Sequence, residues 1–116
     1  MKTVRNKTVF QGDVCFRRVK VIPPEFKREE RRGELIVAHS ETQHHHVIED
    51  SGVVRFDAGD PLRCFLQLES ADHCDVVHRR PFDTHEIVRL NGGKGSIYEV
   101  IRSREWTPAG WRRVED

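Results

Sequence analysis

Turn-forming residues recur about every ten residues along the chain, and short runs of alternating apolar and polar side chains lie between them. The runs cover residues 9–21 (broken at Gly12-Asp13), 34–38, 44–49, 53–56, 63–69, 75–78, 86–90, 96–106 and 111–114. This period of two is typical of strands that bury one face. The charged segment 25–32 lacks the apolar stripe of an amphipathic helix, which favours an exposed loop. The sequence therefore predicts an all-β fold, a small β-barrel or β-sandwich of about nine short strands with little helix.

The size and charge of the chain limit the classes of function. Its 116 residues suit one domain, residues 1–116. The 20 lysines and arginines nearly balance 19 aspartates and glutamates, which leaves a net charge of +1. Such a chain has no overall attraction to nucleic acid or to an anionic membrane. A membrane partner is not expected, and nucleic acid remains open only through local basic patches.

The cysteines and the lack of long apolar segments bear on the compartment. Cys15, Cys64 and Cys74 are odd in number and form no CxxC pair. This argues against a disulfide framework or a zinc ribbon, and it favours a reducing compartment. No stretch approaches the ~18 apolar residues of a membrane-spanning helix, and residues 1–7 lack the apolar run of a signal peptide. We expect a soluble cytoplasmic protein.

The run His44-His45-His46 is the strongest candidate for a functional site. On a strand, His44 and His46 leave the same face and His45 leaves the other. Two imidazoles on one face can both reach a single metal ion at ~2 Å. His78 ends one predicted strand and His85 begins the next, so strand pairing could bring them beside the first pair. The predicted metal ligands are His44, His46, His78 and His85, a set that suits zinc, iron, nickel or copper.

Two other interpretations of the histidines remain open. Paired imidazoles can act as general acid and general base without a metal, for example in phosphodiester cleavage. Arg79, Arg102 or Arg104 would then stabilise a phosphate transition state. Alternatively, the run is a surface feature without a function, because a short HxH motif has low specificity.

Two segments near the C-terminus suggest other kinds of site. Residues 91–95 form a glycine-rich turn, but the phosphate-loop spacing is absent and a strand follows, so a hairpin or bulge turn is predicted.

By strand parity, Tyr98, Arg102 and Arg104 share one face with Trp106. This aromatic and basic face could bind a nucleotide or a single nucleic-acid strand. The alternative is that Trp106 packs in the core and the arginine stems lie along it.

The order His44, His46, Glu49 resembles the metal motif of cupins, which are small β-barrels with an HxH pair followed by a glutamate and a later histidine. The resemblance implies a metal-binding, catalytic barrel. It is an analogy of pattern, because the glycine that precedes the cupin pair and the late PxG motif are absent from this chain.

A second resemblance covers nearly the whole chain. Gln11-Gly12-Asp13-Val14, Gln43-His44-His45-His46, His78 with His85, and the segment 98–106 (YEVIRSREW) are similar to motifs of a group of small bacterial and phage proteins with no assigned activity. The resemblance favours His44 and His46 over His45. It also suggests a function of another class, that of a phage or mobile-element accessory protein that binds a nucleotide, a nucleic acid or a host protein without catalysis. An exposed edge strand would allow a homodimer.

Overall fold

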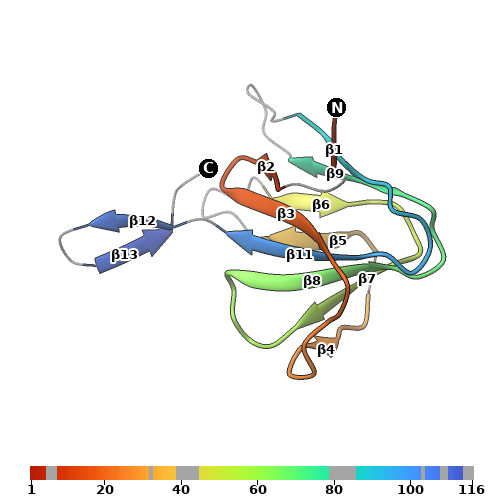
Figure 1. Ribbon diagram of the computed structural model, residues 1–116, viewed down its shortest axis with the longest axis horizontal. Helices are drawn as coiled ribbons and strands as arrows, with labels where there is room; N and C mark the ends of the chain where they lie inside the picture. The colour runs from red at the N-terminus through yellow and green to blue at the C-terminus, as the bar shows by residue number, and fades with distance from the viewer. Residues whose placement is uncertain are drawn as a thin grey trace.

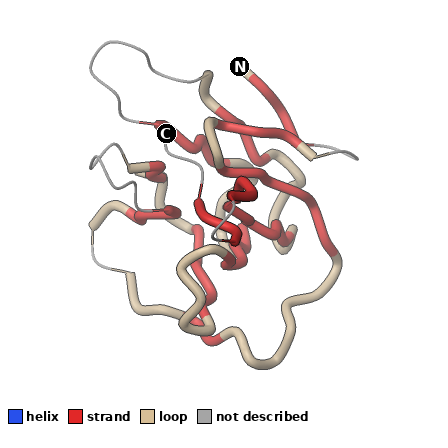
Figure 2. Tube along the Cα trace, turned by 90° about the vertical axis from the view of Figure 1, so that its left-hand side faces the viewer, coloured by secondary structure: helices blue, strands red, loops and turns tan. Residues whose placement is uncertain are grey.

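The structure is a computed structural model of the chain. It describes residues 1–4, 8–31, 33–38, 45–78 and 86–102, and the backbone of two further strands at 104–107 and 110–113. Every regular element in this part of the chain is a β-strand (Figure 2), which confirms the predicted all-β class. None of the described segments forms a helix long and apolar enough to cross a membrane.

The first sheet has five strands in the order β1-β10-β9-β6-β5. Figure 1 shows β9, β6 and β5 as neighbours in this sheet. Their bounds are Lys2–Val4 (β1), Leu35–Ala38 (β5), His46–Ile48 (β6), Cys74–His78 (β9) and Val88–Leu90 (β10). All neighbours are antiparallel except β1 and β10, which are parallel.

The second sheet has six antiparallel strands in the order β2-β3-β11-β8-β7-β4. Their bounds are Val9–Gln11 (β2), Val14–Val19 (β3), Lys27–Arg28 (β4), Val53–Asp57 (β7), Arg63–Leu68 (β8) and Ile97–Arg102 (β11). The last two strands, β12 (Arg104–Thr107) and β13 (Gly110–Arg113), pair only with each other in a small separate sheet.

The hydrophobic core lies between the two larger sheets and takes side chains from both. The predicted alternation decides which side chains these are. On β3, Val14 and Phe16 are fully buried while Arg17 is exposed, and on β8 Leu66 and Leu68 point into the core. Each such side chain contributes roughly 1.5–3 kcal/mol when it leaves water. The fold is therefore a two-layer β-sandwich held together by alternate residues of its strands.

Two turns differ from the prediction. The segment 50–52 was expected to close a tight turn between paired strands, and 91–95 to close a hairpin or bulge turn. Instead, each connects a strand of the first sheet to a strand of the second, β6 to β7 and β10 to β11. Both pack against the end of β8: Glu69 N donates to Gly52 O, and Gly95 N donates to Leu68 O. Strand alternation predicts the turns but not the sheet to which each strand belongs.

Three strand boundaries also differ. The predicted long strand 96–106 is divided into β11 and β12, which belong to different sheets. The segment 25–32, expected to be a loop, contains the short edge strand β4, and β1 was not predicted at all. Strands of two or three residues carry too little alternation to be recognised before their partners are known.

The cysteines are free, and the fold protects them unequally. Burial raises the pKa of the Cys64 thiol to about 11 and that of Cys74 to about 12, and burial followed by the charge of Glu99 raises the pKa of half-buried Cys15. The reactive thiolate is therefore scarce at pH 8. We expect a disulfide reagent such as DTNB to label Cys15 slowly in the folded protein and all three thiols in denaturant. Fast labelling of a second thiol in the folded state, or in Cys15→Ser, would contradict this.

Candidate functional site

One end of the core is polar. Five buried side chains meet there and form what we call the polar end: Gln11, Asp13, His46, His78 and Arg102, each no more than 5% exposed. His46 follows the inward parity of Ile48 on β6, His78 that of Val76 on β9, and Arg102 that of Val100 on β11. The alternation that builds the apolar core thus also directs these polar groups inward.

His46 and His78 lie side by side. They are direct partners in the antiparallel pairing of β6 with β9. Their rings are stacked, with centroids 3.9 Å apart and planes inclined by 11°. Both side chains are fully buried. Two imidazolium rings this close would repel each other in a low-dielectric interior.

Gln11 fixes the orientation of the His46 ring. Its Nε2 donates hydrogen bonds to the backbone carbonyls of Val76 (2.8 Å) and Glu86 (3.0 Å). Its Oε1 therefore faces His46 Nδ1, at 2.9 Å. Because an amide oxygen can only accept, Nδ1 of His46 must carry the hydrogen. In the neutral ring the lone pair then lies on Nε2.

Asp13 faces the other side of the same ring. Its Oδ2 accepts from Nε and Nη2 of Arg102, at 3.2 and 3.0 Å. Its Oδ1 lies 3.7 Å from His46 Nε2. All three residues are buried, so their charges interact in a medium of low dielectric constant. A proton on His46 Nε2 would be stabilised by this carboxylate.

The geometry suits chemistry at one atom, Nε2 of His46. A ring that donates through Nδ1 to a fixed acceptor has a defined tautomer, which is how proteins orient histidines that bind metals. The same arrangement orients a histidine that gives or takes a proton. Gln11 crosses from the second sheet to the first to do this, so the polar end also connects the two layers.

The structure brings together two of the four predicted metal ligands, His46 and His78. His44 and His85 lie outside the described residues. Within the described ranges, no three His, Cys, Asp or Glu side chains are arranged to hold a metal ion. The two described imidazoles therefore supply only part of a ligand set, since a metal centre in a protein takes at least three protein ligands.

The predicted aromatic and basic surface is not formed by the residues that can be placed. Tyr98 is fully buried, and its hydroxyl accepts from Gly92 N at 2.7 Å. Arg102 is buried against Asp13. Neither presents a face on which a base could stack. Arg104 begins β12, but its side chain lies outside the described part of the structure.

Gln11 and Asp13 were not predicted as site residues from the sequence, although both belong to the motif Gln11-Gly12-Asp13-Val14 that carries the family resemblance. A signal was present: the break at Gly12 places polar side chains on both sides of a turn between two strands. Gly12 adopts a φ of 60°, which lets the chain reverse there. Only the folded structure shows that both side chains then point inward, where Gln11 is 1% and Asp13 4% exposed.

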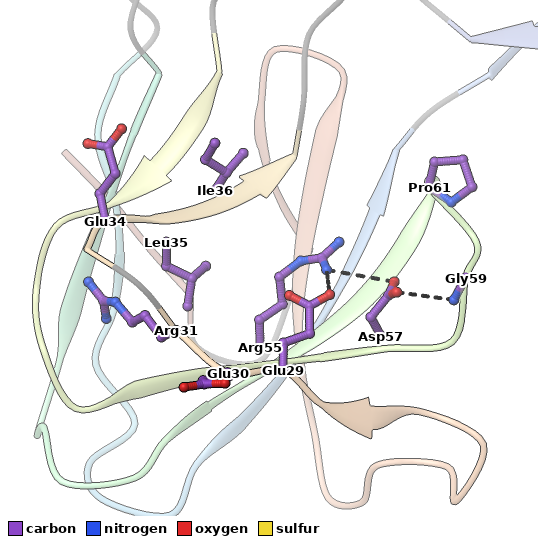
Figure 3. A pocket seen from close by; sticks show the side chains of 10 residues that line it. All are labelled: Glu29, Glu30, Arg31, Glu34, Leu35, Ile36, Arg55, Asp57, Gly59 and Pro61. Carbon is purple, nitrogen blue, oxygen red and sulfur yellow. Dashed lines mark hydrogen bonds and ion pairs between the residues drawn. The ribbon is translucent and has the colours of Figure 1, made fainter.

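A hollow of about 520 Å³ lies between the segment 29–36 and β7 (Figure 3), and none of the five residues of the polar end lines it. Four carboxylates and two arginines are among its lining residues. Figure 3 shows Arg55 between Glu29, with which it pairs, and Asp57. Arg31 donates to backbone carbonyls, among them that of Ile48. Both arginines are thus held by the protein itself.

Comparison with known proteins adds one relationship. No curated protein and no solved structure matches the chain. A family model described as "Domain of unknown function (DUF8820)" matches residues 10–103. The matched range begins just before Gln11 and ends just after Arg102, so it contains all five residues of the polar end. By this match, the chain belongs to the DUF8820 family.

Proposed function

We propose that the polar end binds a transition metal ion through His46 and His78, with His44 and His85 as the further ligands. The observation that carries the proposal is the hydrogen bond from His46 Nδ1 to Gln11 Oε1, beside the stacked ring of His78. It leaves Nε2 of His46 as the nitrogen with the lone pair in the neutral ring, as a metal ligand requires.

The donor set determines which ions fit. Imidazoles suit zinc, iron, nickel and copper and are poor ligands for magnesium or calcium. Asp13 is a less suitable ligand than the histidines because its Oδ2 is bound by Arg102. A metal held by imidazoles can polarise a substrate or a bound water. We extend the proposal on this ground to a catalytic, cupin-like centre.

The cellular compartment is proposed from the state of the cysteines. Cys64 and Cys74 are buried free thiols, and Cys15 is also free. Free thiols are typical of a reducing environment. We therefore place the function in the cytoplasm.

The test is metal analysis of the purified protein, with thermal unfolding as a second measurement. We expect about one zinc, iron, nickel or copper ion per chain. Adding that ion to the stripped protein should stabilise it by about 2.7 kcal/mol at a hundredfold excess over Kd. Both effects should be lost in His44→Ala/His46→Ala and in His44→Ala/His85→Ala. The exposed His73 provides the matched control, and His73→Ala should retain both.

The second double variant matters because His46 is fully buried, and its removal alone could unfold the protein. Circular dichroism separates loss of metal from loss of fold. A stripped protein that gains no stability from any of the four ions would exclude the metal site. General acid–base chemistry at His46 Nε2 would then be the alternative that this end of the core offers. Asp13 Oδ1, at 3.7 Å, would stabilise the protonated ring.

A further inference from the structure

A second hollow, of about 650 Å³, lies at the opposite end of β3 and β11 from the polar end. We call it the basic hollow, and its lining residues are Arg18, Val19, Lys20, Lys94, Gly95, Ser96 and Ile97. It carries three cationic side chains and no carboxylate in its lining. Val19 and Ile97, which are partners in the β3–β11 pairing, give it an apolar wall.

Arg18 of the basic hollow differs from the other arginines whose side chains are described. Seven of the eight arginines with described side chains bond to a carboxylate or a backbone carbonyl: Arg17, Arg28, Arg31, Arg55, Arg63, Arg89 and Arg102. Arg18 is the exception among them, and neither Lys20 nor Lys94 has a carboxylate partner within the described ranges. The other described arginines are bonded within the protein, whereas Arg18 is available to a ligand together with two nearby lysines.

The strand pairing directs Arg18 toward the basic hollow. Arg18 is the register partner of buried Tyr98, so it continues the inward parity of β3 to the open end of the sandwich. There its guanidinium lies beside Gly92: a Cβ at that position would come within 2.9 Å of Arg18 Cζ and 2.6 Å of the Tyr98 hydroxyl. Glycine at this position leaves space for the guanidinium next to the backbone. Arg18 is exposed, so its charge is available to a ligand.

We propose that the basic hollow binds a small phosphorylated molecule through its phosphate groups. A guanidinium binds phosphate oxygens in a fork, and ammonium groups add point charges. Three cations in one place suit a ligand that carries at least two negative charges. The volume is that of a small-molecule site, and the Val19–Ile97 wall provides contact for a less polar part of the ligand.

A small ligand fits better than a nucleic acid. Among the side chains that are described, these three cations gather in one hollow of small-molecule size, and the whole chain has a net charge of only +1. The site is independent of the proposed metal centre because it lies at the other end of β3 and β11. Chelation by EDTA should not affect it.

The experiment is isothermal titration calorimetry of the full chain in EDTA, with inorganic triphosphate, ATP and a single-stranded DNA oligonucleotide as probes. We expect triphosphate and ATP to bind, and the binding to be lost near 1 M salt, where the Debye length is about 3 Å. Arg18→Glu and Lys94→Glu should each weaken binding by about tenfold or more. Lys27→Glu is the matched control: Lys27 is an exposed lysine of β4 outside the hollow, and its reversal should change Kd by less than about twofold.

Each outcome bears on the proposal. Tighter binding of ATP than of triphosphate supports it and adds a contact with the apolar wall. Equal binding supports it through phosphate alone. Binding of the oligonucleotide only, binding of none of the probes, or equal weakening by Lys27→Glu and Lys94→Glu would overturn it. Lys94 lies on an exposed turn, so Lys94→Glu tests the site even if Arg18→Glu disturbs the packing against Gly92.

Discussion

Arg102→Met is expected to lower the free energy of unfolding by about 3–5 kcal/mol. Arg102 is 5% exposed, and two of its nitrogens bond to Oδ2 of Asp13, which is 4% exposed. Methionine fills part of the volume but removes the positive charge. The Asp13 carboxylate then stays buried without its guanidinium, which is among the most destabilising changes a single substitution makes. Urea unfolding monitored by circular dichroism measures the effect.

Two further variants test that explanation. Arg17→Met makes the same chemical change at an ion pair whose arginine is exposed. Its partner Glu99 is buried but keeps Arg63 as a second cation, so the change should cost less than about 1 kcal/mol. Asp13→Leu/Arg102→Met removes both charges and should be more stable than Arg102→Met alone, because no charge is left buried without its partner. If Arg102→Met were no more destabilising than Arg17→Met, the buried pair would not hold this end of the core together.

Gly52→Ala is expected to lower the free energy of unfolding by about 2–4 kcal/mol, the second large effect. Gly52 adopts a φ of 82° in the turn from β6 to β7. A Cβ there would lie 2.5 Å from Ser70 Oγ and 2.9 Å from Ala71 N. The backbone nitrogens of Glu69 and Ser70 both donate to Gly52 O, so the turn cannot move away without losing these bonds. Alanine therefore adds strain and a clash at the same place.

Gly59→Ala separates these two causes. Gly59 has a similar φ, 88°, but a Cβ there would meet nothing within 4 Å. Its substitution should cost only the left-handed strain, about 1–2 kcal/mol. The difference between the two variants in chemical denaturation measures the clash at Gly52. Equal losses would show that the contact with residues 70–71 relaxes without cost.

The alternation of side chains in the sequence predicted most of the strands, although not β1, β4 or the division of 96–106. Val14 and Phe16 on β3, and Leu66 and Leu68 on β8, all point into the core as expected. This works because the period of two is a local property of an extended backbone. The same parity placed His46 on the face that turned out to be buried, next to Ile48.

The partners of the candidate site were beyond the sequence. Alternation does not say that β6 pairs with β9, which is what stacks His46 on His78. Nor does it say that Gln11, from the second sheet, reaches across to hold a ring of the first. Tyr98 was placed by its parity on a possible binding surface. The face that it shares with Val100 instead lies inside the sandwich.

The sequence by itself determined the all-β class, the alternating faces of the strands and the histidines that deserved testing. Tertiary structure alone decided which end of the core is polar, that Asp13 and Arg102 neutralise each other there, and that Arg18 and Lys94 share a hollow at the other end. The physical reason is that strand parity is set by local backbone geometry. Pairing between distant strands is instead selected by the joint burial of both sheets, a property of the whole chain.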